Sequence, residues 1–343
     1  MTKRHCTLAA SVFVAFLLLS LAACAANGGA GTTGPGAFTV TDQAGRQVEV
    51  GGAAHRIVSG YYISSSVCIA LGLSDRLVGI EARADSRPIY ALSKPELINL
   101  PPVGTAKDFN IEACLELKPD IVILPYRLRD AADILAEMGV PAILVNPEGY
   151  PEILEMIALI GQVAGETDKA ERLIAWCERA RAEVDELTAE IPAMPPVYMC
   201  GVGSWLATAP SGMYQASLIE IAGGRNTAGD IEGTGWIDVS YEQLLAINPE
   251  IMVIPSEAGY GKQDILSDLP LSRLSAVTSG RVYQMPSAFE AWDSPVPASM
   301  LGAKWLLCVL HGDIYPIETL LQDAAGFYRE FYDIEIDTTL IYK

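Results

Sequence analysis

Two stretches of this sequence repeat one pattern: IEACLELKPDIVIL at 111–124 and YEQLLAINPEIMVI at 241–254. The offset is 130 throughout, so Glu112 matches Glu242 and Pro119 matches Pro249. Each stretch reads as an amphipathic helix, a turn at the proline and a short buried strand. The repeat therefore predicts a structural unit that the chain contains twice.

Short apolar runs alternate with helical segments around both copies. Strands of this kind, nearly all apolar, are typical of a parallel sheet covered by helices on both faces. We expect strands near 55–60, 120–125 and 141–146, and again near 196–201, 250–255 and 280–286. An alternating stretch with a central glycine at 38–50 predicts a hairpin at the edge. The sequence thus predicts an N-terminal α/β lobe at 38–150 and a C-terminal α/β lobe at 196–343.

The alternation of strands and helices stops in the segment 151–195, which has two helical patterns and no strand. The second pattern, at 168–191, is charged and periodic, and a helix of that length spans roughly 36 Å. A helix so long without a strand beside it indicates a connector. The expected fold is α/β, with two Rossmann-like lobes, each with a parallel sheet, joined by a long α-helix and separated by a ligand cleft.

The N-terminus has the features of a lipoprotein precursor. A basic start is followed by an apolar run and by LAAC at 21–24, which predicts a signal peptide at 1–23 and lipid attachment to Cys24. A single transmembrane anchor is the alternative, but the apolar run is short for a span. The glycine-rich segment 24–37 predicts a flexible tether. We expect a protein outside the cytoplasm, anchored by lipid to the cell membrane.

Composition and missing motifs exclude several functions. A formal net charge of −19 argues against a nucleic-acid partner. The sequence has no GxSxG, HExxH or Walker motif, which argues against an enzyme. Past the signal peptide only His55 and His311 remain, so we expect no cofactor and no directly bound metal. The five cysteines beyond Cys24 are scattered and predict buried thiols, although one disulfide stays open.

The loops after the strands are the expected ligand site, because strand ends face the crevice in open α/β sheets. Aromatic and charged residues follow the predicted strands, as a bulky polar ligand requires. The candidates are Tyr61, Tyr62, Arg83, Tyr126, Arg127, Trp205, Glu290, Trp292 and Asp293.

Several segments together resemble one family. They are VTDQAGRQVEV (40–50) with HRIV (55–58), the block at 111–124, LIEIAGGRN (218–226), WIDVSYEQLLAINPEI (236–251) and EAWDSP (290–295). The chain resembles the substrate-binding lipoproteins of ABC importers, in the class with a rigid inter-lobe helix. That class serves iron–siderophores, haem, cobalamin and some oxyanions. The resemblance implies that Glu112 and Glu242 dock onto basic residues of a permease dimer, which works with its ATPase.

The resemblance leaves the ligand open. Trp236 matches one of three aromatic positions of cobalamin-binding members, but Ala106 and Arg83 stand at the other two. Arg83, Lys107 and Arg127 indicate an anionic ligand, because guanidinium groups grip carboxylates and oxyanions. We expect delivery of a metal chelate, preferably a ferric siderophore. The alternatives are molybdate or tungstate, haem or a corrinoid in the same role, and a chelatase-like extracellular enzyme using Glu290 and Asp293.

Overall fold

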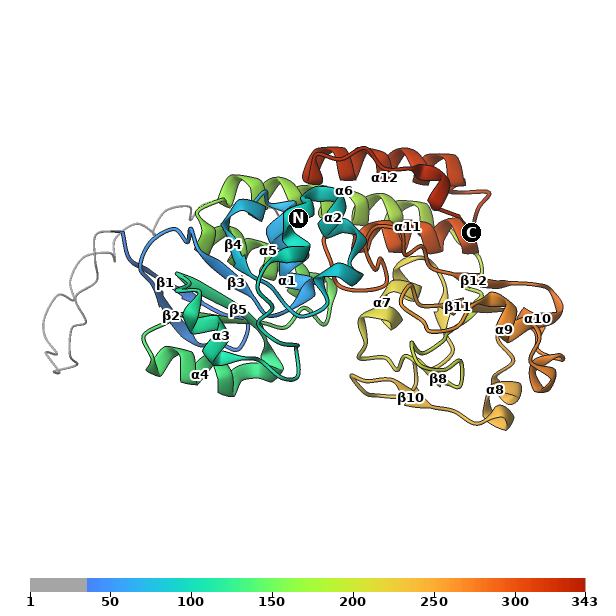
Figure 1. The fold of residues 1–343 in the computed structure, drawn as a ribbon. Coiled ribbons are helices and arrows are strands. Elements are labelled where there is room, and N and C mark those ends of the chain that lie inside the picture. The colour runs from blue at the N-terminus through green and yellow to red at the C-terminus, as the bar shows by residue number, and fades with distance from the viewer. Residues whose placement is uncertain (1–35, 343) are drawn as a thin grey trace, which may run out of the picture. The chain divides into compact units, whose positions relative to one another are not determined.

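The computed structural model describes residues 36–342 and contains a four-stranded parallel sheet in the N-terminal lobe (Figure 1). Its strand order is β4-β3-β5-β6. The strands are β3 (Ile57–Ser59), β4 (Leu77–Gly79), β5 (Ile121–Pro125) and β6 (Ala142–Val145). Every residue of β3, β5 and β6 is buried, which explains the uninterrupted apolar runs. The predicted hairpin is β1 (Phe38–Thr41) paired with β2 (Gln47–Val50).

The C-terminal lobe contains a second parallel sheet, ordered β12-β11-β7-β9. Its strands are β7 (Pro196–Met199), β9 (Arg225–Asn226), β11 (Ile251–Ile254) and β12 (Val282–Gln284). A small antiparallel ribbon of β8 (Ala207–Thr208) and β10 (Ile237–Asp238) lies beside it. The prediction of two lobes with parallel sheets is confirmed.

Helices cover both faces of each sheet. In the N-terminal lobe they are α1 (Tyr62–Ala70), α2 (Pro88–Ser93), α3 (Ile111–Glu116), α4 (Arg129–Glu137) and α5 (Tyr150–Ala164). In the C-terminal lobe they are α7 (Tyr214–Ile221), α8 (Tyr241–Ile247), α9 (Lys262–Leu266), α10 (Ser275–Thr278) and α11 (Ser299–Leu310). Neighbouring residues of a strand point to opposite faces of the sheet. Val122 packs in a hydrophobic core with residues of α3 and α4. Ile121 packs in a second core, on the other face, that continues into the C-terminal lobe. Among residues 36–342, no helix is long and apolar enough to cross a membrane.

The connector is α6 (Thr167–Thr188), 22 residues long. It packs against α5 and α11. The buried Lys304 of α11 forms ion pairs with Glu183 of α6 and Asp323 of α12 (Ile317–Tyr332). The expected long connecting helix is thus confirmed, and it packs against helices of both lobes.

The helix α12 was not predicted from the sequence. Figure 1 shows this helix lying over α6. Its aromatic face meets the connector, with the Trp176 and Phe327 ring centroids 4.4 Å apart. Farther along α12, Tyr328 and Tyr332 point toward the junction of the lobes and reach Glu290.

The duplicated unit has the same construction in both lobes. Asn110 caps α3, accepting a hydrogen bond from the Ala113 N–H at 3.0 Å, and Ser240 caps α8. After each helix comes a residue in the left-handed conformation, Lys118 (φ 48) or Asn248 (φ 43), again 130 positions apart. A proline and the buried strand follow, as the pattern predicts.

Candidate functional site

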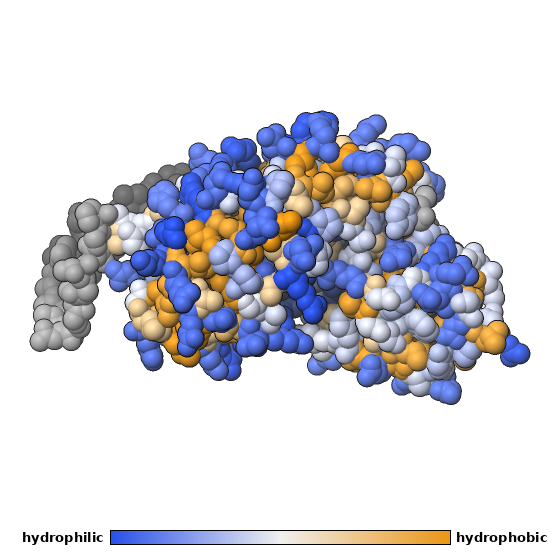
Figure 2. Space-filling view, viewed as in Figure 1, coloured by the Kyte–Doolittle hydropathy of each residue, from blue (hydrophilic) through white to orange (hydrophobic). Residues whose placement is uncertain are grey.

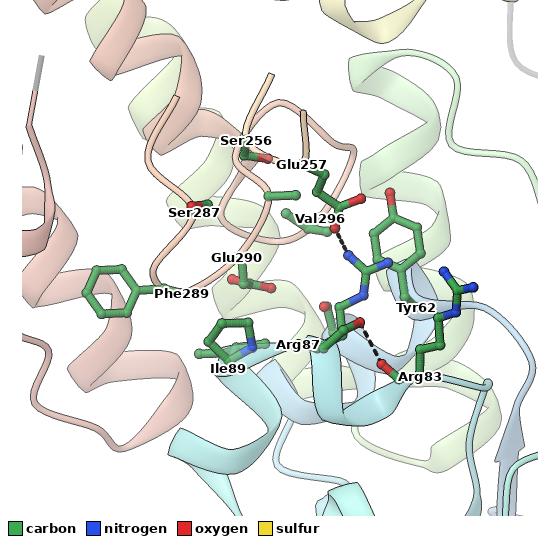
Figure 3. Close-up of a pocket in the computed structure, with 14 residues that line it drawn as sticks. Tyr62, Arg83, Arg87, Ile89, Ser256, Glu257, Ser287, Phe289, Glu290 and Val296 are labelled. Carbon is green, nitrogen blue, oxygen red and sulfur yellow. Dashed lines mark hydrogen bonds and ion pairs between the residues drawn. The ribbon is translucent and has the colours of Figure 1, made fainter. Parts of the chain in front are cut away.

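A cavity of about 430 Å³ lies where the two lobes meet (Figure 3). This volume is within the usual range for small-molecule sites. Hydrophilic residues also gather at the junction of the lobes on the face shown in Figure 2. The N-terminal lobe contributes Tyr62, Ser66, Arg83, Ser86, Arg87, Pro88 and Ile89, and the C-terminal lobe contributes Ser256, Glu257, Ser287, Phe289, Glu290, Ala291 and Val296.

Arg83 forms part of the cavity wall through an unusual backbone conformation. It adopts the left-handed region at φ 68, immediately before a short 3-10 turn (Ala84–Ser86). The Ser86 hydroxyl donates a hydrogen bond to the Arg83 carbonyl at 2.7 Å and closes this turn. Within residues 36–342 the Arg83 guanidinium has no ion-pair partner. Arg83 therefore presents an uncompensated positive charge at the cavity.

Arg87 is a second arginine of the cavity and was not among the residues predicted from the sequence. It directly precedes α2, whose first residue is Pro88. Its guanidinium carbon lies 4.1 Å from the centre of the Tyr62 ring, within the range of a cation–π contact. Arg87 also forms an ion pair with Glu257 of the opposite lobe. No local pattern in the sequence marks Arg87, because a 3-10 turn and not a shared helix places it beside Arg83.

Tyr62 is the first residue of α1 and follows β3, as expected from the strand-end rule. Its hydroxyl donates a hydrogen bond to the Ser294 hydroxyl of the other lobe at 3.0 Å. Burial raises the pKa of Tyr62, while the Ser294 hydrogen bond and the charge of Arg87 oppose the rise. Tyr62 therefore stays a neutral hydroxyl at physiological pH.

Tyr61 and Arg127 lie next to Tyr62. The Tyr61 ring packs edge-on against the Tyr62 ring at 5.4 Å between centroids. Burial raises the pKa of Tyr61, and Arg127 opposes this shift by its charge and a hydrogen bond. The structure thus brings together residues from the ends of two neighbouring strands, β3 and β5.

Glu290 lies in the wall of the cavity and is only 5% exposed. The Tyr332 hydroxyl donates a hydrogen bond to it at 2.9 Å, and the Tyr328 hydroxyl donates another at 3.4 Å. Burial raises the pKa of Glu290 to about 7, against the lowering effect of these hydrogen bonds. Burial therefore favours the protonated carboxyl group at pH values where an exposed glutamate is ionised.

The structure places Trp292 in the core and not in the lining of this cavity, and its contact with the ligand stays a prediction. The side chain is fully buried, and its indole N–H donates a hydrogen bond to the Tyr328 hydroxyl at 2.8 Å. Asp293 is also buried, and it accepts hydrogen bonds from the Ser256 backbone N–H and hydroxyl. Burial raises the pKa of Asp293. Asp293 thus acts on the cavity by holding Ser256 in place.

Tyr61 and Arg127 lie outside the lining of this cavity, and so do four other predicted residues. The Trp205 indole donates a hydrogen bond to Asp268 within the C-terminal lobe. Trp236 is half-buried beside β10, while Tyr126 and Lys107 are exposed. Their roles in ligand binding stay predictions.

Glu112 and Glu242 occupy equivalent places in the two lobes. Each is exposed in the first turn of its helix, α3 or α8. Hydrogen bonds from its own backbone N–H and from Ser240 lower the pKa of Glu242. The structure therefore presents one carboxylate on each lobe, as a duplicated docking surface requires, but their docking role stays a prediction.

Known proteins share this architecture and sequence pattern. Residues 57–289 match the periplasmic binding protein family. The chain is 24% identical to the molybdate-binding protein MolA of Haemophilus influenzae, over 85% of this chain and 90% of that protein. It is 25% identical to a vitamin B12-binding protein of Yersinia pestis, over 59% of this chain and 70% of that protein.

Solved structures agree in fold. The structure of MolA bound to molybdate has a TM-score of 0.79 at 22% identity, covering 88% of this chain and 99% of that chain. A periplasmic solute-binding protein from Veillonella parvula also gives a TM-score of 0.79, at 26% identity, covering 89% of this chain and 95% of that chain.

The chain belongs to the periplasmic binding protein family. It is a substrate-binding protein of the class that serves ABC importers, so both the recognised class and the assignment as a binding protein rather than an enzyme are confirmed. The family acts outside the cytoplasm, in agreement with the expected location. Cys24, the signal peptide and most of the tether lie outside the described residues, so the lipid anchor stays a prediction.

Proposed function

We propose that this protein captures a compact oxyanion, of the molybdate and tungstate type, and delivers it to an ABC permease. One observation carries the proposal: arginines and hydroxyl groups line the cavity, whereas Trp205, Trp236 and Trp292 do not. This changes the preference among the ligands expected from the sequence, because Tyr62 and Phe289 alone in the lining offer the aromatic surface that a flat metal chelate uses.

The donors in the cavity suit the oxygens of an anion. Guanidinium groups form short, charge-assisted hydrogen bonds with oxyanions, and Arg83 and Arg87 supply two of them. The Ser287 hydroxyl adds a neutral donor that can hold an oxyanion without adding charge. The longer alignment with the molybdate-binding relative than with the vitamin B12-binding relative supports the same preference.

An anionic metal chelate, such as a ferric siderophore, is the second candidate. The cavity of about 430 Å³ supports it, because four oxygen atoms at roughly 30 Å³ each, the volume of a water molecule, occupy much less. The exposed Arg83 would then contact the acidic part of a larger ligand.

Delivery would use the two lobes symmetrically. In this proposal Glu112 and Glu242 contact basic residues on the two subunits of the permease, and the lipid on Cys24 keeps the protein at the membrane. The equivalent exposure of both glutamates on matched helices supports this arrangement.

Calorimetric titration of the compact unit, residues 34–343, tests the ligand class. The ligands are molybdate, tungstate, sulfate, phosphate, a ferric hydroxamate, a ferric catecholate, haem and cyanocobalamin. We expect saturable, stoichiometric binding of molybdate or tungstate. Binding of a ferric chelate alone would establish the second candidate, and binding of haem or cyanocobalamin alone would contradict both.

A further inference from the structure

One ion pair crosses the cavity and connects the two lobes directly. Arg87 stands at the start of α2 in the N-terminal lobe, and Glu257 follows β11 in the C-terminal lobe. Both residues line the cavity, and Figure 3 shows their side chains meeting across it. Their side chains are 23% and 44% exposed, so water reaches the pair and the two groups are able to separate.

The Arg87 guanidinium is held in a defined orientation. One face lies over the Tyr62 ring at 4.1 Å, and Tyr62 is itself fixed by its hydrogen bond to Ser294. The ring supports the guanidinium face and leaves the edge, with its N–H donors, directed into the cavity (Figure 3). In this structure the carboxylate of Glu257 accepts from that edge.

A carboxylate and an oxyanion present the same chemistry to a guanidinium. Each offers two oxygens at a spacing that a planar fork of N–H donors matches. In this structure Glu257 occupies the Nη1 donor of Arg87, so an anion that approaches this edge must share or displace that contact. The geometry therefore creates a competition within the cavity.

We propose that Glu257 competes with the anionic ligand for the guanidinium of Arg87 and thereby limits how tightly, and how selectively, the anion is held. This inference rests on the proposed function. An entering anion takes over the Arg87 edge, and the carboxylate of Glu257 turns toward solvent. Weak or singly charged anions fail to displace it, so Glu257 favours ligands of higher charge density.

The same exchange affects how the lobes are joined. Before the exchange, the ion pair between Arg87 and Glu257 connects the two lobes. Close to it in the chain, the Ile89 N–H donates a hydrogen bond to the Phe289 carbonyl of the other lobe at 3.1 Å. Removing the charge of Glu257 loosens this connection in the absence of any ligand. The loosening gives a readout that does not depend on knowing the ligand.

The test compares the full chain with its Glu257→Gln and Glu250→Gln variants. Glu250 is a matched control, because it lies in the same lobe and pairs with Arg281, away from the cavity lining. We expect Glu257→Gln to bind molybdate or tungstate about fivefold more tightly, the scale of a partly exposed ion pair. The Glu250→Gln variant should stay within twofold of the unmodified chain.

Hydrogen exchange without added anion provides the second readout. We expect the Ile89 amide to exchange faster in Glu257→Gln than in the unmodified chain or in Glu250→Gln. Equal anion affinity in all three proteins, or weaker binding by Glu257→Gln, would overturn the competition while leaving the proposed function intact. Absence of anion binding in all three would overturn the proposed function and the competition with it.

Discussion

Substitution of Glu290 by glutamine tests the electrostatics of the cavity wall. The carboxyl group is almost fully buried, and burial raises its pKa from 4.5 to about 7. The native protein therefore holds a proton on Glu290 over a pH range in which the unfolded chain has released it. Glutamine has a similar shape and carries no titrating group, so the variant removes this one effect.

The size of the effect follows from the shift. About 2.5 pKa units at 1.36 kcal/mol per unit correspond to roughly 3 kcal/mol. Because the pKa of Glu290 is higher in the folded protein than in the unfolded chain, protonation of Glu290 stabilises the folded protein. This contribution to the unfolding free energy is fully present below about pH 4.5 and is lost as the pH rises through about 7. The unmodified protein should therefore lose roughly 3 kcal/mol of unfolding free energy relative to Glu290→Gln between pH 4 and pH 8.

Urea unfolding followed by circular dichroism measures this difference at several pH values. The comparison between two variants cancels the titration of all other groups. Glu232→Gln, at an exposed position, is the control and should show no such trend. A stability difference between the unmodified protein and Glu290→Gln that stays constant from pH 4 to pH 8 would refute the reasoning.

Three further predictions concern binding and transport. Arg83→Gln should weaken oxyanion binding about tenfold, as measured by calorimetry. Little stability should be lost, because the Arg83 guanidinium has no ion-pair partner within residues 36–342. Unchanged affinity would show that Arg83 does not bind the ligand. The double variant Glu112→Arg, Glu242→Arg should abolish uptake into cells and keep its ligand affinity; a loss of affinity would contradict the docking role. Trp292→Phe should bind the ligand with unchanged affinity. It should lose roughly 1–2 kcal/mol of unfolding free energy in urea, because it removes the buried hydrogen bond to Tyr328. A loss of affinity without a loss of stability would show that Trp292 contacts the ligand.

The sequence predicted the sheets and the connector because both leave strong local patterns. The buried strands β5 and β11 read as apolar runs after a proline turn, and the repeat at 111–124 and 241–254 identified both. α12 was missed although it is amphipathic. Its aromatic face packs on Trp176 of α6, a contact that only the tertiary fold creates. The sequence also contains no second copy of this helix that would draw attention to it.

The site was predicted less completely because side-chain direction depends on the tertiary fold. The strand-end rule found Tyr62, Arg83 and Glu290, which all line the cavity. The same rule selected Trp292, yet the chain after β12 turns this indole into the core. Arg87 escaped the rule because a 3-10 turn carries the chain from Arg83 back to the cavity, and the sequence alone does not specify that turn.

The most direct test of the central claim is a crystal structure of the protein with tungstate, using the anomalous signal of tungsten to locate the ligand. We predict one strong peak in the cavity between the lobes, with oxygens accepting hydrogen bonds from Arg83 and Arg87. A peak elsewhere on the molecule, or a cavity without tungsten at saturating tungstate, would contradict it.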